Sequence, residues 1–219
     1  MSERNLSKTT NPKRIAIIGS GNVGGALATG LSKVGHTIHL GVRDPNQFKG
    51  KELLRNPKTL ALPIKESVTQ SEVIILATPA AKASEVAKDL GDTTGKIIID
   101  TMNTVLSRGA DGFSNTSDAI LANTKTRDVV KCFNTTGFGN MENPSYGSLA
   151  LDMFCAGDSK LGIALAKQFA IEIGFENCYY VGGNDRFELM EQFAFFWINL
   201  AMFQGLGREF GFKILKGRS

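Results

Sequence analysis

Three glycines near the start of the chain have the spacing of a dinucleotide-binding turn. Gly19, Gly21 and Gly24 form a G-x-G-x-x-G pattern within the segment RIAIIGSGNVGGALATGLSKVG, residues 14–35. In this pattern the first glycine allows a tight turn, the second lets the backbone approach a pyrophosphate, and the third lets helix and strand pack closely. The helix that follows offers free N–H groups and a positive dipole end to the phosphates. The spacing predicts a dinucleotide site along Gly19, Ser20, Gly21, Asn22, Val23 and Gly24.

The end of the next apolar run bears on which dinucleotide is bound. An acidic residue there bonds the ribose 2′-OH of NAD, whereas an arginine accommodates the 2′-phosphate of NADP, about 20 residues past the glycines. The sequence LGVRDP places Arg43 at this distance, and Asp44 comes one residue later. We therefore predict NADP in preference to NAD, with the Ser20 hydroxyl as a second contact to the same phosphate. The alternative is that Arg43 only pairs with Asp44 or with solvent.

Hydride transfer to a carbonyl or imine also needs a proton donor. The two histidines, His36 and His39, flank the second apolar run, which belongs to the adenine side of such a fold. The 3-hydroxyacid dehydrogenases carry a catalytic lysine and asparagine on the long helix after the nucleotide domain. The corresponding segment here, residues 185–207, contains Asn199 but no lysine. The sequence therefore offers no obvious acid or base for reducing a carbonyl.

Polar but neutral residues follow the later apolar runs, where the loops of such folds line the ligand. Thr78 and Pro79 come after one run, Thr101, Met102 and Asn103 after the next, and the loop FNTTGFGNMENPSYG, residues 133–147, after a third. These side chains can orient a planar ring, although the loop could also be an ordinary surface segment. Candidates for the nicotinamide pocket are Thr101, Asn103, Asn134 and Thr135. A flavin or deazaflavin, which accepts hydride at a ring atom, would need no acid from the protein.

Short apolar runs alternate with amphipathic stretches along the first half of the chain. The runs are rich in Ile and Val without polar alternation, which is typical of parallel strands covered on both faces. Strands are predicted at 14–18, 37–42, 60–64, 72–78, 96–100, 129–133, 151–157 and 178–183, and helices at 22–33, 81–90, 159–173 and 185–207. The expected fold is α/β, a doubly wound and mainly parallel Rossmann sheet with a small, mostly helical C-terminal lobe. The expected parts are a disordered tail at 1–12, an NADP-binding Rossmann domain at 13–150, and the lobe at 151–219.

Composition favours an ordinary globular protein. The 219 residues are 42% hydrophobic and 21% charged, with a net charge of +4. No apolar run approaches the ~20 residues that span a bilayer, and the polar N-terminus has no secretory pattern. The three cysteines, Cys132, Cys155 and Cys178, lack metal-site spacing and are expected to be free thiols. We expect a cytoplasmic protein without a metal, a membrane contact or a nucleic-acid partner.

The segment from Phe193 to Phe203 is apolar at every position except Asn199. A helix that is apolar all round must be buried on all sides. Two interpretations remain open at this point: a central core helix, or a helix held between the C-terminal lobe and a second subunit. The second interpretation predicts a homodimer through the Phe193–Phe203 region.

Several segments together resemble the NADPH-dependent reductases of coenzyme F420, an 8-hydroxy-5-deazaflavin, and their bacterial relatives. The segments are IAIIGSGNVGGALA, LGVRDP, VIILATP, IIIDTMN, VVKCFNTTGFGNM, MFCAGD and GLGREFGFKIL. The resemblance implies a homodimeric oxidoreductase that transfers hydride between NADPH and a deazaflavin or flavin such as FMN. It implies pyrophosphate contacts for Ser20, Asn22 and Val23, a 2′-phosphate contact for Arg43, and nicotinamide-ribose contacts for Thr78 and Pro79.

The resemblance has departures, and two other functions stay open. Archaeal members have a second hydroxyl before the arginine and a lysine shortly after it, where this chain has Val42 and Gln47. The first alternative is a reductase of a small carbonyl or imine substrate, with Thr101 or a bound water as the proton donor. The second is a non-catalytic NADP-binding sensor.

Overall fold

The computed structural model describes residues 8–105 and 110–217, and its main feature is one mixed sheet. Eight strands of the described residues join in the order β10-β9-β6-β5-β4-β1-β2-β3. Neighbouring strands are parallel except β6 and β9, which are antiparallel. The strands are β1 Arg14–Ile18, β2 Thr37–Val42, β3 Thr59–Pro63, β4 Val73–Leu76, β5 Ile97–Asp100, β6 Val129–Cys132, β9 Asp152–Ala156 and β10 Asn177–Gly182. The part from β3 to β6 has the strand order 3-2-1-4-5-6 of dinucleotide-binding sheets, which confirms the predicted Rossmann fold.

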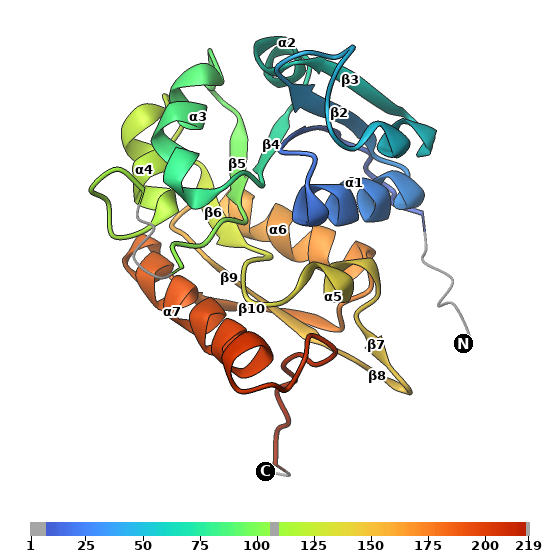
Figure 1. Cartoon of the computed structure of the whole chain (residues 1–219), viewed down its shortest axis with the longest axis vertical. Helices are drawn as coiled ribbons and strands as arrows, with labels where there is room; N and C mark the ends of the chain where they lie inside the picture. Colours follow the sequence, from blue (N-terminus) through green and yellow to red (C-terminus); the bar gives the residue numbers. More distant parts are fainter. Residues whose placement is uncertain (1–7, 106–109, 218–219) are drawn as a thin grey trace.

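Helices cover both faces of this sheet. They are α1 Asn22–Val34, α2 Ile64–Thr69, α3 Ala83–Asp89, α4 Thr116–Asn123, α5 Phe138–Glu142, α6 Lys160–Glu172 and α7 Phe187–Ile198. Short turns of tighter or wider helix span Lys51–Arg55, Ala80–Lys82, Asn184–Arg186 and Asn199–Phe203, and a small hairpin pairs β7 Ser145–Tyr146 with β8 Leu149–Ala150. In Figure 1 the blue and teal elements α1, β2 and β3 lie at the right and upper right, the green helix α3 at the upper left, and the red helix α7 at the lower left, above the C-terminus.

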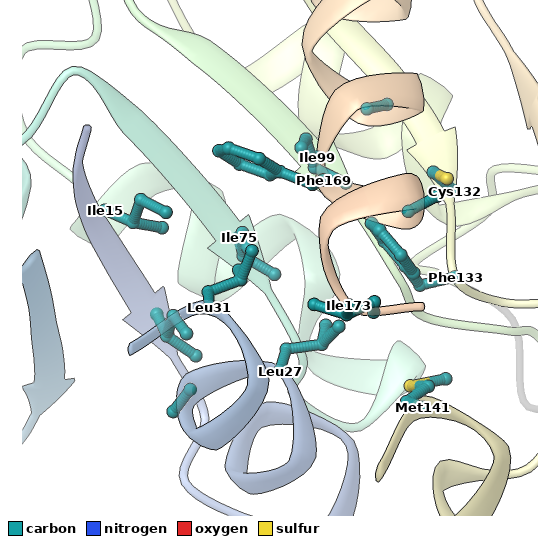
Figure 2. Close-up of a cluster of buried hydrophobic side chains, with 14 of the residues drawn as sticks. Ile15, Leu27, Leu31, Ile75, Ile99, Cys132, Phe133, Met141, Phe169 and Ile173 are labelled. Carbon is teal, nitrogen blue, oxygen red and sulfur yellow. The ribbon is translucent and has the colours of Figure 1, made fainter. Parts of the chain in front are cut away.

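The core consists of two apolar layers on either side of the sheet. Figure 2 shows one layer, in which Leu27 and Leu31 of α1, Met141 of α5 and Phe169 of α6 meet residues of the central strands. The other layer holds apolar residues of α2, α3 and α4 against the opposite side of the same strands. Successive residues of one strand point to opposite faces, so both must be apolar when both faces are covered. This explains the unbroken Ile and Val runs of the sequence.

Residues after 150 continue the sheet. The β9–α6–β10 unit adds two strands beyond β6, and α6 packs in the same layer as α1. The predicted boundary between residues 150 and 151 stays a prediction, although the sheet itself runs across it. Of the predicted tail, residues 1–7 lie outside the described residues. Within the described part, the Thr9 N–H donates to the Val34 carbonyl at 2.8 Å.

Helix α7 is not a central core helix. Its Phe187, Met190, Ala194 and Trp197 are buried, whereas Phe196 is 51% exposed, and Phe203 in the turn after the helix is 55% exposed. The prediction that this segment is buried on all sides is therefore wrong for a single chain. One side of α7 packs on β9, and the other side is open. In the described residues, no helix is long and apolar enough to cross a membrane.

Candidate functional site

In the glycine turn after β1, the surrounding backbone leaves no space for a side chain at two of the three glycines. Gly19 has φ 109°, and a Cβ atom there would lie 2.4 Å from the Ala77 carbonyl oxygen. A Cβ on Gly24 would lie 1.8 Å from the Gly19 carbonyl oxygen. These two positions require glycine because no side chain fits between the turn, the end of β4 and helix α1.

Gly21 differs from the other two glycines. It precedes α1 with φ −79°, a value open to any residue, and a Cβ there would meet nothing within 4 Å. Packing within the chain thus gives no reason for glycine at this position. A ligand that approaches the backbone closely would give one. Helix α1 begins here with neither a capping side chain nor an acidic residue in its first turn, so its N-terminal end can receive a phosphate.

The turn lies where the strand order of the sheet reverses. Strands β1 and β4 are neighbours, and the chain leaves them on opposite faces of the sheet, to α1 and to α3. Ligands of open α/β sheets bind outside the carboxyl ends of the strands at such a point. Thr78 and Pro79 follow β4 there. The Thr78 hydroxyl is 3.2 Å from the Met102 sulfur, and Pro79 is exposed.

Arg43 follows β2 on the same edge of the sheet. Its guanidinium lies 3.7 Å from a carboxylate oxygen of Glu85, and its side chain is 85% exposed. Asp44 instead accepts a hydrogen bond from the Asn46 N–H, so the pairing partner of Arg43 is Glu85 rather than Asp44. The Ser20 hydroxyl donates to the carbonyl of Lys49, in the segment that follows β2.

An asparagine pair connects the loops after β5 and β6. The Asn134 side-chain amide donates to Asn103 Oδ1 at 2.9 Å and to the Met190 carbonyl of α7 at 3.0 Å. The Asn103 amide returns a hydrogen bond to the Asn134 carbonyl. Asn134 Oδ1 is buried without a partner among the described residues. A buried acceptor of this kind is available to a donor that is not part of the chain.

The other two predicted pocket residues are more enclosed. Thr101 is buried, and its hydroxyl donates to the Leu76 carbonyl at 2.8 Å. Because the side chain is buried and this hydrogen bond is internal, a substrate cannot reach the proton, which removes the basis for Thr101 as a proton donor. Thr135 is 1% exposed and faces the Met153 sulfur. Of the four candidates, Asn103 alone is partly exposed.

A charged cluster lies beneath these loops. The Lys131 ammonium on β6 is 2.7 Å from Asp100 Oδ2 and 2.8 Å from Glu191 Oε1, and all three side chains are buried. Thr116 of α4 bonds both carboxylates, and Thr104 donates to Glu191 from its backbone and from its hydroxyl. The cluster thereby ties β5, β6, α4 and α7 to the loop that contains Asn103.

Electrostatics keeps Glu191 ionised in this cluster. Burial alone would raise the pKa of Glu191. The positive charge and hydrogen bond of Lys131, together with the Thr104 and Thr116 donors, hold that pKa below its ordinary value. A buried lysine with two carboxylate partners is fully paired, so it has no free proton to exchange with a ligand. The sequence did carry a signal for this cluster, since Lys131 interrupts the apolar run VVKCF, but it did not show the partners.

A groove opens beside the loop after β6. Its volume is about 650 Å³, and its walls come from the 137–146 segment, which includes α5, and from the end of α7 with the segment after it. The lining residues include Gly137, Phe138, Tyr146, Trp197 and Arg208. The Tyr146 hydroxyl donates to Asn140 Oδ1 at 2.7 Å, and burial raises its pKa above the ordinary value. Sequence reasoning did not single out Tyr146 or Trp197.

The two histidines and the three cysteines serve packing. His36 is fully buried and lies 2.8 Å from a carboxylate oxygen of Glu172, while His39 bonds the Ser71 hydroxyl. Burial lowers the pKa of His39. In the sheet, β1 and β4 separate β2 from β5 and β6, whose following loops hold the asparagine pair. Cys132, Cys155 and Cys178 are free, as predicted.

Comparison with known families agrees with this geometry. Residues 14–104 match the model of the family described as NADP oxidoreductase coenzyme F420-dependent. This part of the chain carries the domain of that family. The match begins at β1, ends just after Asn103, and includes the glycine turn, Arg43 and Thr78. The resemblance predicted from the sequence is thus confirmed for residues 14–104, which are less than half of the chain.

Known relatives extend the likeness to most of the fold. A candidate F420-dependent NADP reductase from Arthrobacter sp. FB24 matches with a TM-score of 0.78 and 23% identity, over 93% of this chain and all of that one. A reductive aminase from Aspergillus terreus in complex with NADPH and ethyl-5-oxohexanoate matches with a TM-score of 0.63 and 18% identity, over 89% of this chain and 64% of that one. At these identities the likeness establishes the fold.

A curated sequence relative matches only in part. Glycerol-3-phosphate dehydrogenase (NAD(P)+) from Thermoanaerobacter sp. strain X514 is 31% identical over 97 residues. The match covers 39% of this chain and 29% of the relative. This chain therefore corresponds to less than a third of the length of that enzyme.

Proposed function

We propose that this protein transfers hydride between NADPH and a deazaflavin such as coenzyme F420, or a flavin such as FMN. The proposed NADPH site rests mainly on Gly21. Its φ is open to any residue and a Cβ there would contact nothing in the chain, so a closely bound ligand is the reason for a glycine at this position. NADPH supplies the hydride when bound. Backbone N–H groups at the start of α1 would hold the pyrophosphate, and Arg43 the 2′-phosphate.

The acceptor part of the proposal follows from the character of the nicotinamide end. Asn103, Asn134, Thr101 and Thr135 are neutral, and the charged groups nearby, Lys131, Asp100 and Glu191, are buried and paired with one another. Such groups can fix the position of a ring but cannot readily supply a proton. The groove between the 137–146 segment and Trp197 has room and aromatic surface for a planar acceptor. Positioning two rings in contact is the protein's contribution to such a reaction.

A glycine pair tests the cofactor site. Gly21→Ala should leave the free energy of unfolding unchanged, because a Cβ there contacts nothing, yet should weaken NADPH binding by at least about tenfold. Gly25→Ala is the matched control, since its Cβ would make only ordinary contact with Leu53 at 3.6 Å. NADPH affinity is measured by fluorescence titration and stability by urea unfolding. Unchanged NADPH binding in Gly21→Ala would remove the main support for the site.

Stopped-flow oxidation of NADPH tests the acceptor. F420 and FMN are offered separately to the purified chain, and absorbance is followed at the NADPH band. Fast oxidation with F420 alone identifies a deazaflavin reductase, and fast oxidation with FMN alone identifies a flavin reductase. Failure of both acceptors while NADPH still binds would contradict the proposed acceptor class.

The second candidate function is reduction of a small carbonyl or imine, and Tyr146 favours it. Tyr146 lines the groove and is 37% exposed, so a substrate in the groove can replace Asn140 as the partner of its hydroxyl. It could deliver the proton that Thr101 cannot. A Tyr146→Phe variant should lose turnover with such a substrate while retaining NADPH affinity. Equal rates in the variant and the native chain would exclude this role.

The third candidate, an NADP-binding sensor, predicts tight NADPH binding and no turnover with any acceptor.

We also propose a homodimer through the open side of α7 and the turn after it. Phe196, Met202 and Phe203 are each more than half exposed there, an apolar surface that water disfavours. Light scattering should give twice the 23.6 kDa mass of one chain. A monomer at all concentrations would contradict the dimer.

A further inference from the structure

Two cations from separate elements meet at one carboxylate beside the predicted 2′-phosphate position. Arg43 comes from the end of β2, and Lys82 from the short turn after β4. The Lys82 ammonium lies 2.5 Å from Glu85 Oε2, and the Arg43 guanidinium lies 3.7 Å from Glu85 Oε1. Each oxygen of the carboxylate thus faces one cation. We call these three residues the Arg43–Lys82–Glu85 cluster.

Packing does not explain the cluster. The side chains of Arg43, Lys82 and Glu85 are 85%, 54% and 47% exposed. An exposed ion pair contributes little to stability, so the cluster can be rearranged at little cost. The hydrogen bond and charge of Lys82, together with the charge of Arg43, lower the pKa of Glu85, so its carboxylate stays ionised at neutral pH.

The carboxylate occupies the place between the cations that an anionic ligand group would take. A phosphate, like a carboxylate, presents several oxygens that can accept from an arginine and a lysine together. At the fourth residue after Arg43 the sequence has Gln47 rather than a lysine. The fold supplies one from another loop, because β2 and β4 both flank β1 and end on the same edge of the sheet.

We infer that Lys82 is a second ligand of the NADP 2′-phosphate and that Glu85 is a resident counter-anion which this phosphate displaces from Arg43 and Lys82. This inference rests on the proposed function, since it requires NADPH in the site. The two residues have opposite effects on cofactor choice. Lys82 favours NADP by attracting the phosphate. Glu85 opposes NADP by repelling it, and a carboxylate at this place can also accept a hydrogen bond from the free 2′-OH of NAD.

The test uses ligands that differ only in the 2′-phosphate. Adenosine 2′,5′-bisphosphate and 5′-AMP are titrated into the full-length chain by calorimetry, alongside NADPH and NADH. Lys82→Gln should weaken the bisphosphate and NADPH by about three- to tenfold and leave 5′-AMP and NADH unchanged. Glu85→Gln should tighten the bisphosphate by about two- to fivefold without tightening 5′-AMP. Lys88→Gln, which removes the same charge from an exposed position later in α3, is the matched control.

The outcomes separate this inference from the proposed function. If Lys82→Gln and Lys88→Gln behave alike while Arg43→Ala loses discrimination between the two nucleotides, Lys82 is not a ligand and the proposed function stands. If Glu85→Gln weakens the bisphosphate, Glu85 is not a displaced counter-anion. If the native chain binds none of the four ligands, the proposed function fails, and the inference fails with it.

Discussion

At the proposed adenine end of the site, Lys82 is exposed and shares the Glu85 carboxylate with Arg43, whereas at the proposed nicotinamide end Lys131 is buried between two carboxylates. An exposed pair exchanges its partner for a ligand easily because water already screens it. A buried pair cannot, because an uncompensated charge in the interior is costly. The same residue type therefore suits ligand binding at one end and the positioning of loops at the other.

The largest effect is expected from removing the buried cation. Lys131→Met leaves Asp100 and Glu191 as two buried carboxylates without a cation, and should lower the free energy of unfolding by about 3–5 kcal/mol. Urea unfolding measures this loss. Lys82→Met is the matched change at the adenine end and should cost less than about 1 kcal/mol. If both variants lost the same free energy of unfolding, the proposed difference between the buried and the exposed lysine would be wrong.

The next effect concerns the turn that joins the two ends. Gly24→Ala places a Cβ 1.8 Å from the Gly19 carbonyl oxygen, so the turn must shift, and the variant should lose about 1–3 kcal/mol of stability. NADPH binding should fall with it. Gly25→Ala in the same helix should instead be neutral or stabilising by up to about 1 kcal/mol. Thermal unfolding with and without NADPH distinguishes the two results.

Substitution in the asparagine pair should lower stability by less than the changes above and should also lower turnover. Asn134→Ala removes the hydrogen bonds to Asn103 and to the Met190 carbonyl, and should cost about 1–2 kcal/mol. Turnover should fall while NADPH affinity stays unchanged, because Asn134 lies away from the phosphate contacts. Parallel measurement of kcat and of the NADPH dissociation constant tests this. A sensor would show no turnover to lose.

The smallest effect is expected from pH. The pKa of Glu191 is lower in the folded chain than its ordinary value, so its ionised form stabilises the fold above that ordinary value. This contribution should be lost as the pH falls through the folded-state pKa, where the carboxylate gains a proton. Urea unfolding at pH 7 and at successively lower pH, for the native chain and for Glu191→Gln, should show a steeper acid loss in the native chain. Parallel profiles would contradict a role for Glu191 ionisation.

Sequence patterns were informative where a local rule applies and silent where distant segments meet. Residues 14–18 and 37–42 are strands as predicted, because an apolar run bounded by turns has one stable arrangement in a covered sheet. The helix expected at 185–207 ends at Ile198 as a regular α-helix, and one of its sides is open. Apolar composition shows that a surface avoids water but not what covers it.

The sequence by itself determined the glycine turn, the sheet that presents it, and the arginine placed after β2. These depend on spacing along one βαβ unit, in which a few residues set the conformation. Only the tertiary structure decided that Lys82 joins Arg43 on Glu85, that Lys131 pairs with Asp100 and Glu191, and that Tyr146 and Trp197 line one groove. The physical reason is that these contacts join segments up to 60 residues apart, such as Lys131 and Glu191, whose meeting depends on strand order and helix packing.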